Sequence, residues 1–304
     1  MVISTNNLRI WMHSLKQFLL TALMLVGSSQ VGAMDLVLAG VYDTNPLNGE
    51  STRQFENSME LTLAGNRELS ASLHRRLALT GAITLDQKQR YESMSKLVLS
   101  SGLDYRWQPK LGYVQPWYVA RLQGQYLGVS NDHRNRMSLI ASGQRAARLT
   151  DQLLHYVDFS WRQSFGDEAV FDQGFGQINY GIDYNIRNGW FLYSRLTLGA
   201  GQTWGSVLDD TARSGSHLAM GRAHHSPNES GYDASFTDSG LADDVGGDWT
   251  TYRFDANLAA IEFGFNKAVS NAMSLDVAWQ HNTLLFDGGN YQKHVLAFTF
   301  MTLI

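Results

Sequence analysis

The chain contains no cysteine and only four prolines among its 304 residues. A protein of this size without cysteine holds together without disulfide bonds, which argues against a small disulfide-stapled extracellular fold. Glycine (28 residues) and aromatic residues (12%) are plentiful. Together these features favour long uninterrupted strands with tight turns over helices.

The chain also lacks an excess of basic residues and the common motifs of phosphate and metal sites. Its formal net charge is -4 at pH 7 and it has no run of lysines or arginines, so nucleic acid is not an expected partner. It has no glycine-rich phosphate loop and no His-Glu-x-x-His pattern. His217, His224 and His225 do not have a diagnostic metal-ligand spacing. We therefore expect no cofactor and no metal site.

Long apolar runs are limited to one near the N-terminus, residues 18–26. Basic residues precede it, and Val31 and Ala33 occupy the two small-residue positions that a signal peptidase requires. The run is about half as long as a helix that spans a bilayer. We therefore predict a cleaved secretory signal peptide over residues 1–33 and a mature domain over 34–304.

Apolar and polar residues alternate through most of the mature domain. In the stretch QINYGIDYNI, one face carries Ile178, Tyr180 and Ile182, and the other carries Asn179 and Asp183. Period-two alternation of this length predicts a β-strand, and the Asn-Gly pair that follows predicts a hairpin. The twelve segments of this kind are 35–43, 57–73, 77–85, 95–107, 117–127, 136–148, 153–163, 175–186, 190–204, 250–267, 273–285 and 292–304.

After the first segment, long and short connections follow each other in turn. An even number of strands with short turns at one end and long loops at the other is typical of outer-membrane barrels, whose short turns face the periplasm. The long connections are 44–56, 86–94, 128–135, 164–174, 205–249 and 286–291, and the short ones are 74–76, 108–116, 149–152, 187–189 and 268–272.

Tryptophans lie near both ends of the expected strands. Two aromatic bands are the arrangement that the two interfaces of a bilayer select. The tryptophans beside short connections are Trp107, Trp117 and Trp190, and those near long connections are Trp161, Trp204 and Trp249.

The last segment, KHVLAFTFMTLI, places Leu296, Phe298, Phe300 and Ile304 on one face. This pattern resembles the C-terminal strand of Gram-negative outer-membrane β-barrel proteins, which the barrel-assembly machinery recognises; that strand usually ends in Phe or Trp. The resemblance implies an all-β, closed antiparallel transmembrane β-barrel of about 12 strands, porin-like, in the cell outer membrane. It also implies contact with outer-membrane lipid and lipopolysaccharide.

If the apolar face meets lipid, the polar face lines the lumen. Arg253 and Asp255 reach this face through a one-residue slip that we expect near Ala259. The two faces also predict that arginine destabilises the barrel more at Ile182 than at Asn179. The predicted lumen-lining residues are Glu60, Lys96, Asp104, Arg106, Arg121, Asp158, Arg162, Asp183, Arg195, Arg253, Asp255 and Asp276.

Six acids and six bases make this predicted lumen charge-balanced, which is compatible with two functions. Paired charges bridged by water would form a network that stiffens the wall. Alternatively, opposed acids and bases would line a passive channel for small neutral or zwitterionic solutes, because strong ion selectivity needs a surplus of one sign. Twelve strands enclose enough space for single small molecules if no loop plugs the lumen. The passive, porin-like channel is our leading hypothesis.

The connection 205–249 is the longest and is strongly acidic, with eight carboxylates against Arg213 and Arg222. A loop of this length is usually functional or disordered. We expect it on the extracellular side. There it would plug the lumen, bind divalent cations that bridge to lipopolysaccharide, or remain a solvated surface loop.

An outer-membrane lipid hydrolase is the alternative from the enzyme class. His224, Ser226 and Asn228 are similar to the His-x-Ser pair and the Asn of outer-membrane phospholipases, which place the pair on a strand. Here all three lie in the connection 205–249, where no strand would hold them rigid. We therefore expect no enzyme. The further alternatives are a solitary autotransporter-like barrel and a plugged barrel that acts as a scaffold or receptor.

Overall fold

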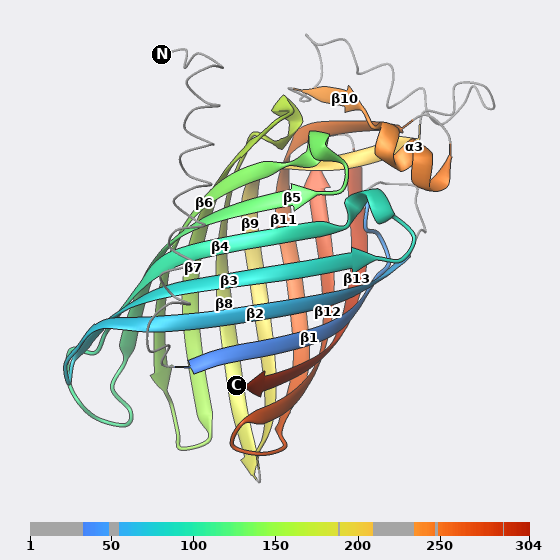
Figure 1. The fold of residues 1–304 in the computed structure, drawn as a ribbon. Coiled ribbons are helices and arrows are strands. Elements are labelled where there is room, and N and C mark those ends of the chain that lie inside the picture. Colours follow the sequence, from blue (N-terminus) through green and yellow to red (C-terminus); the bar gives the residue numbers. More distant parts are fainter. Residues whose placement is uncertain (1–32, 49–54, 188, 209–233, 247–248, 288) are drawn as a thin grey trace, which may run out of the picture.

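The computed structural model describes residues 33–48, 55–187, 189–208, 234–246, 249–287 and 289–304. In this part of the chain, all thirteen strands belong to one antiparallel sheet. The sheet closes because β9 pairs with β11 and β13 pairs with β1. Twelve strands thus form a closed barrel wall, and only β10 stands outside it, as a short addition to the edge of β11 (Figure 1).

The wall strands agree closely with the twelve predicted segments, and the predicted all-β barrel is confirmed. Two elements were not predicted, the short strand β10 and the helix α3, both inside the connection 205–249. Single turns of 3-10 helix (η) lie in three further connections. The elements are β1 (Ala33–Asp43), β2 (Glu56–Ala71), β3 (Arg75–Lys88), η1 (Glu92–Met94), β4 (Lys96–Trp107), β5 (Trp117–Val129), η2 (Asp132–Arg134), β6 (Arg136–Arg148), β7 (Leu153–Gly166), η3 (Ala169–Phe171), β8 (Gln173–Arg187), β9 (Trp190–Leu208), β10 (Ser235–Thr237), α3 (Ser239–Val245), β11 (Trp249–Ala268), β12 (Met273–Phe286) and β13 (Gly289–Leu303).

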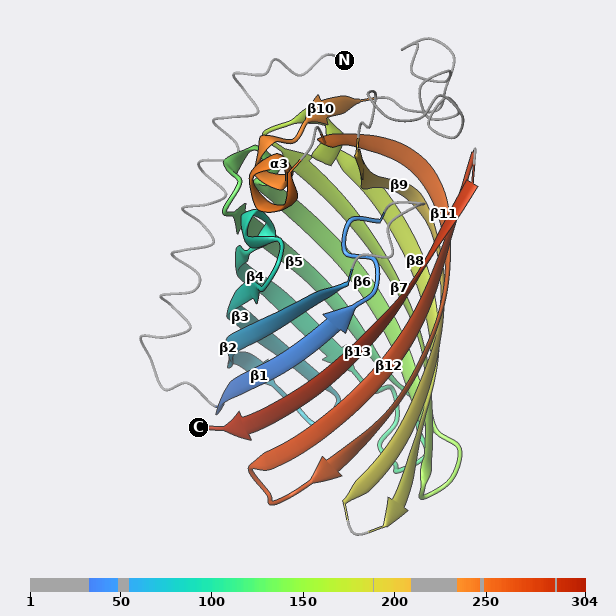
Figure 2. The same cartoon turned by 90° about the vertical axis from the view of Figure 1, so that its right-hand side faces the viewer.

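The two ends of the barrel differ as the lengths of the connections predicted. The short turns lie at the lower end in Figure 1, near the start of β1 and the end of β13, while α3 and β10 lie at the upper mouth (Figures 1 and 2). One expectation was wrong. The connection 286–291 was predicted to be long, but β12 ends at Phe286 and β13 begins at Gly289, so these strands form a tight hairpin.

The two faces of the wall differ in polarity. On one face, Leu38 lies opposite Leu61 on β2 and Phe300 on β13. Large apolar side chains on this face, such as Leu122 and Phe298, are 52% and 56% exposed. In water so wide an apolar surface would be an aggregation liability, whereas acyl chains accept it. The protein is therefore a transmembrane β-barrel of the Gram-negative outer membrane.

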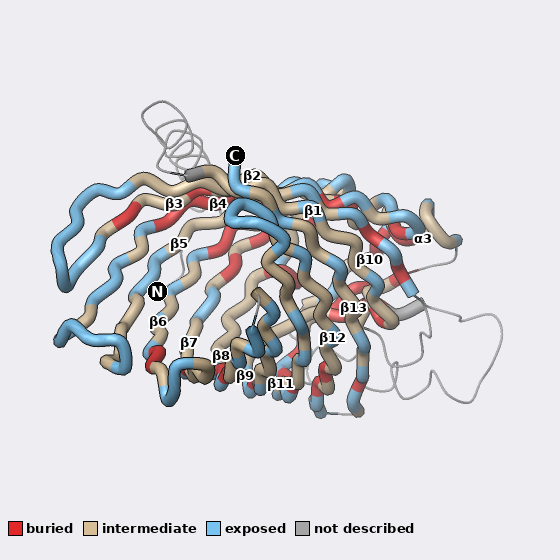
Figure 3. The backbone as a smooth tube through the Cα atoms, turned by 90° about the horizontal axis from the view of Figure 1, so that it is seen from below, coloured by how far each residue is buried: buried red, intermediate tan, exposed pale blue. Residues whose placement is uncertain are grey.

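Burial within the wall follows from this arrangement. Seen from the short-turn end, buried residues are spread around the strands and are not gathered in one central core (Figure 3). On the lumen face, polar side chains of neighbouring strands contact one another, as Asn179 and Thr197 do, so several are buried there. Among the described residues, no helix has both the length and the apolar character needed to span a membrane.

The predicted aromatic bands are only partly correct. Trp107, Trp161 and Trp190 lie partly exposed on the outer face, as expected. Trp117 instead lies on the lumen face, where the guanidinium carbon of Arg106 is 5.2 Å from its ring centre. The other two, Trp204 and Trp249, take part in the structure at the upper mouth that is described below.

The predicted signal peptide and most of the connection 205–249 cannot be compared with the structure. Residues 1–32 and 209–233 lie outside the described residues, so the cleavage after residue 33 stays a prediction. The hydrolase-like residues His224, Ser226 and Asn228 fall in the same undescribed range.

Candidate functional site

Five connections at the upper end fold inward and pack against one another across the mouth. We call this structure the cap. Each of its central side chains is at most 3% exposed, although all but one come from connections between strands and the last begins β11. The cap residues are Leu47, Tyr91, Arg134, Phe171, Asp238, Leu241 and Trp249.

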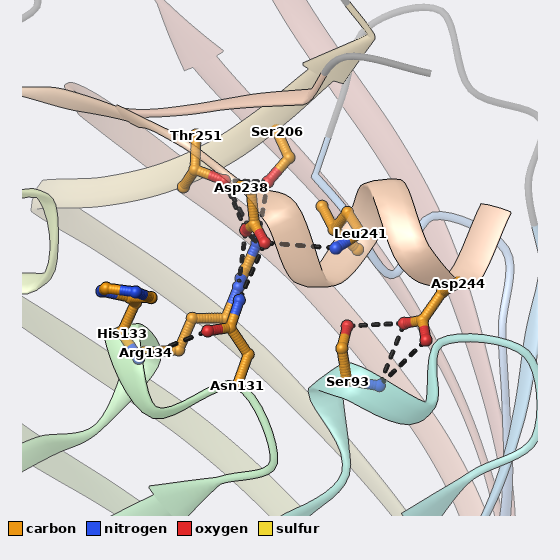
Figure 4. Close-up of polar contacts among 9 residues, drawn as sticks. All are labelled: Ser93, Asn131, His133, Arg134, Ser206, Asp238, Leu241, Asp244 and Thr251. Atoms are coloured by element: carbon orange, nitrogen blue, oxygen red, sulfur yellow. Dashed lines mark hydrogen bonds and ion pairs between the residues drawn. The ribbon is translucent and has the colours of Figure 1, made fainter. Parts of the chain in front are cut away.

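An ion pair between Arg134 and Asp238 lies at the centre of the cap (Figure 4). Arg134 ends η2, between β5 and β6, and its Nε donates a 2.8 Å hydrogen bond to Asp238 Oδ2. Asn131 Nδ2 and Thr251 Oγ1 also donate to this carboxylate, at 2.9 and 3.1 Å. The contact joins the β5–β6 connection to the β9–β11 connection, and the strands β7 and β8 lie between the two along the wall.

The same carboxylate begins α3. Asp238 is the N-cap residue, and its Oδ1 accepts a 3.2 Å hydrogen bond from the backbone N–H of Leu241. At the other end of the helix, the Asp244 carboxylate accepts from the backbone N–H of Ser93 at 3.0 Å and from the Ser93 hydroxyl. Both ends of α3 are thus held by other connections, so α3 is part of the cap.

The β3–β4 connection is fixed by a second buried carboxylate. Glu56, 1% exposed at the start of β2, accepts hydrogen bonds from the backbone N–H groups of Gln89, Arg90 and Tyr91 at 2.8–3.1 Å. A carboxylate with three backbone donors is well satisfied in a buried position. It therefore holds the Tyr91 ring in the cap.

Burial shifts the protonation equilibria of two cap groups. Desolvation lowers the pKa of Arg134, and the Asp238 carboxylate opposes that shift. Two aromatic rings also contact the guanidinium group, with the centres of Trp204 and Phe171 at 4.8 and 5.6 Å from its carbon. Desolvation raises the pKa of Tyr91 to about 12, and the Tyr91 hydroxyl has no hydrogen-bond partner among the described residues.

We expect Tyr91→Phe to leave the cap as stable as in the wild type or to stabilise it by about 1 kcal/mol, because it removes a buried hydroxyl without a partner. Hydrogen exchange of the α3 amides at neutral pH measures this. In the wild type, the raised pKa means that the capped state favours the neutral phenol. The preference for the neutral Tyr91 phenol therefore stabilises the capped state fully below pH 10, and this stabilisation is lost as the pH rises toward about 12.

The difference in tyrosinate absorbance between wild type and Tyr91→Phe should titrate with a midpoint near pH 12. A midpoint at the ordinary value of 10.0 would show that this ring is not buried in the cap. Faster α3 exchange in Tyr91→Phe would show that the hydroxyl has a hydrogen-bond partner there.

Below the cap, ten of the twelve residues predicted to line the lumen lie on the lumen face of the wall. Among the described residues, one predicted acid–base pair is in direct contact: Arg121 Nε and Nη2 donate to the two Asp104 oxygens at 2.7 and 2.8 Å. The ten residues are Glu60, Lys96, Asp104, Arg106, Arg121, Asp158, Arg162, Asp183, Arg195 and Asp276.

The structure corrects the expected placement of Arg253 and Asp255. The ladder between β9 and β11 runs from Trp249 to Lys267 in one unbroken register, so the slip expected near Ala259 does not exist. Arg253 and Asp255 therefore share a strand face with Phe263 on the outer face and, toward the upper end, with Thr251, whose hydroxyl lies in the cap. Arg253 Nη1 donates to backbone carbonyl oxygens of the β7–β8 connection.

Four of the predicted lumen charges have polar partners that the sequence analysis did not select. Lys96 Nζ lies 3.0 Å from Asp86, which was missed because the third segment was predicted to end at Leu85, whereas β3 continues to Lys88. Arg195 lies 3.7 Å from Glu262.

Neutral side chains partner two further predicted acids. Asn179 Nδ2 donates to Asp158, and Tyr193 OH donates to Asp276. Three further lumen charges were missed, namely Glu262, Arg136 and Lys293. The alternation of polar and apolar residues within their strands would have placed them on the lumen face.

A cavity of about 310 Å³ lies inside the barrel between the cap and the middle of the wall. Its lining includes three cations and no carboxylate, with five side-chain amides and four hydroxyl groups. The lining residues are Asn48, Arg136, Ile140, Ser160, Arg162, Ser164, Gln173, Phe175, Gln177, Gln202, Thr203, Trp204, Leu258, Asn282, Leu284, Tyr291 and Lys293. Of these, the sequence analysis selected only Arg162.

The described residues do not present a metal centre. No group of three or more His, Asp or Glu side chains within the described ranges is placed to hold a metal ion. The candidate functional site therefore consists of the cap, the paired charges of the wall and the polar cavity.

No family model and no curated protein matches the chain. Solved structures with a similar fold include an outer membrane channel from Pseudomonas putida F1, 12% identical over 91% of this chain and 97% of its own, with a TM-score of 0.47. The KdgM porin in complex with disordered oligogalacturonate is 6% identical over 88% and 98% of the two chains (TM-score 0.45). LpxR from Salmonella typhimurium is 9% identical over 88% and 99% (TM-score 0.40). These similarities concern the fold alone.

Proposed function

We propose that this barrel is a passive, porin-like channel for small polar solutes across the outer membrane. The observation that carries the proposal is the cavity of about 310 Å³ inside the closed wall, lined by amides, hydroxyl groups and cations. Polar side chains that face a water-accessible lumen select and guide solutes, whereas a scaffold needs no such space. The proposal assigns no catalytic step to the chain.

The cap adds a condition to this proposal. Its buried contacts lie at the extracellular mouth, so under this proposal the cap closes the channel and conduction requires the cap to open. Partners follow from the same proposal: lipid and lipopolysaccharide around the outer face, a small solute in the lumen, and the barrel-assembly machinery at β13.

Removal of the β9–β11 connection tests the channel. Leu208 and Trp249 face each other in the ladder, so a two-residue Asn-Gly turn can replace residues 209–248 and leave both strands intact. The variant loses α3 and Asp238 and therefore the centre of the cap. In planar bilayers we expect frequent, long-lived conductance steps from this variant and rare openings from the wild type.

A silent variant that folds normally would overturn the channel proposal. Folding is checked by the heat-modifiable gel migration of closed barrels. The same samples test the hydrolase alternative: release of fatty acid from phospholipid or lipid A that disappears in Ser226→Ala would replace the channel with an enzyme.

A further inference from the structure

We infer that the cavity below the cap is a binding site for a small organic anion that carries several hydroxyl groups. This inference rests on the proposed channel function and names the class of solute. It also changes the picture of a charge-balanced lumen, because the balance holds for the whole wall and fails locally at this cavity.

The first observation is the local surplus of positive charge. The cavity is lined by Arg136, Arg162 and Lys293 and by no carboxylate. Lys293 is compensated, since its Nζ lies 3.3 Å from Asp43. Among the described residues, neither arginine has a carboxylate within ion-pair distance. The site therefore presents about two uncompensated positive charges, which makes it selective for anions.

The chemistry of the two cations favours an oxyanion. A guanidinium group presents five N–H donors in a planar fork that fits a carboxylate or a phosphate with two parallel hydrogen bonds. Elsewhere in this lumen, Arg121 uses that fork on Asp104. Arg162 makes no such contact with the described residues, so its fork is available to a solute in the cavity.

The second observation is a buried acceptor without a donor. Asn48 Nδ2 donates to the Trp204 carbonyl oxygen at 3.3 Å, while Asn48 Oδ1 is buried and has no hydrogen-bond partner among the described residues. Asn48 also lines the cavity, from the side of the cap. A hydroxyl group of the solute would supply the missing donor. Two further amides in the lining, Gln177 and Asn282, can both donate and accept.

The size and the apolar part of the lining set the remaining limits. A volume of about 310 Å³ is at the lower end of ordinary ligand pockets and fits one molecule of monosaccharide size. Phe175, Leu258 and Leu284 supply apolar surface against which the carbon-bound hydrogens of such a molecule can pack. The solute class is thus a sugar acid or a similar polyol anion.

Calorimetric titration of the full-length protein in detergent tests the site with a matched pair of probes. Gluconate and sorbitol have the same chain length and differ in the carboxylate. We expect gluconate to bind and sorbitol to bind at least about tenfold more weakly. Arg162→Gln should weaken gluconate binding by about tenfold or more, the loss of roughly one charged hydrogen-bond pair.

Arg106→Gln is the control, because it removes the same charge from the lumen face but lies against Trp117, outside the cavity. It should leave gluconate binding unchanged, and Arg162→Lys, which keeps the charge, should retain more binding than Arg162→Gln. Equal binding of sorbitol and gluconate, or equal losses in Arg162→Gln and Arg106→Gln, would overturn the site. Inorganic phosphate that binds as tightly as gluconate would overturn the role of the hydroxyl groups.

Binding and conduction fail independently. If the barrel binds gluconate but never conducts, the binding site is supported and the channel function is wrong. If the barrel conducts but does not bind gluconate, the channel function is supported and the binding site is wrong.

Discussion

Asp238→Asn is expected to open the extracellular mouth without unfolding the barrel. The substitution removes the only carboxylate that pairs with Arg134 among the described residues, and Arg134 is 3% exposed. Removing one partner of a buried ion pair costs about 3–5 kcal/mol, because the remaining charge is left desolvated. That cost shifts the equilibrium between closed and open cap about a hundredfold or more toward the open state.

The effect should stay local because the wall does not depend on this pair. The twelve wall strands are joined by backbone hydrogen bonds all round the barrel, whereas the cap consists of connections. Parts of a protein with few backbone ladders open at a lower free energy than the global unfolding free energy. Arg134 can therefore return to water by opening of the cap, while the barrel remains folded.

The readouts are open probability in planar bilayers and protease cleavage within the β9–β11 connection, both of which should rise. Asp243→Asn is the matched control: it makes the same change on α3, but Asp243 is exposed, so open probability should stay at the wild-type value. The double variant Arg134→Gln, Asp238→Asn should recover part of the closed state, because no uncompensated charge remains. Equal behaviour of Asp238→Asn and Asp243→Asn would contradict the assigned role of the pair.

The wall could be predicted from the sequence because a bilayer imposes one simple rule on every strand. Lipid lies on one side and the lumen on the other, so a shift of one residue would turn every side chain to the wrong face. The alternation of Ile178, Asn179 and Tyr180 is strict for this reason. Strand ends were less well defined, because near the interfaces the outer face tolerates polar residues, as at the end of β3.

The cap could not be predicted because its residues carry no local pattern. Leu47, Tyr91 and Trp249 look like isolated apolar residues in or beside loops, and only the folded chain brings them together. The acidity of the connection 205–249 suggested a solvated loop as one possibility. Asp238 is instead completely buried, and Arg134, which is distant in sequence, compensates the charge of its carboxylate.

Two errors at the lumen face have distinct causes. A polar residue at Asp255 suggested a slip in β11, but β11 is one of the strands that reach beyond the lipid, and there the outer face no longer has to be apolar. Asn179 looked like a neutral lumen position that would accept arginine. The structure shows it 6% exposed, donating to Asp158 and accepting a 2.6 Å hydrogen bond from Thr197. Arginine at Asn179 would break both bonds, so it is a poor comparison for Ile182.

Leu122 and Gln123 offer a better comparison of the two faces, since they are neighbours near the middle of β5. Leu122 lies on the outer face, 52% exposed, opposite Leu103. Gln123 lies on the lumen face opposite Gly102, which has no side chain to meet a longer one. Arginine on the lipid face near the bilayer midplane costs about 2–4 kcal/mol. The same residue in an aqueous lumen keeps its hydration, so Gln123→Arg should stay within about 1 kcal/mol of the wild type.

Urea titration of both variants in phospholipid vesicles measures this difference, with tryptophan fluorescence and heat-modifiable gel migration as readouts. Because both variants place arginine at neighbouring positions of one strand, the main difference between them is the solvent on each face. Equal destabilisation by Leu122→Arg and Gln123→Arg would mean that Leu122 does not face acyl chains. A larger loss in Gln123→Arg would mean that the lumen at this height is too tightly packed to hold water, which would also remove the path that a solute needs to reach the cavity.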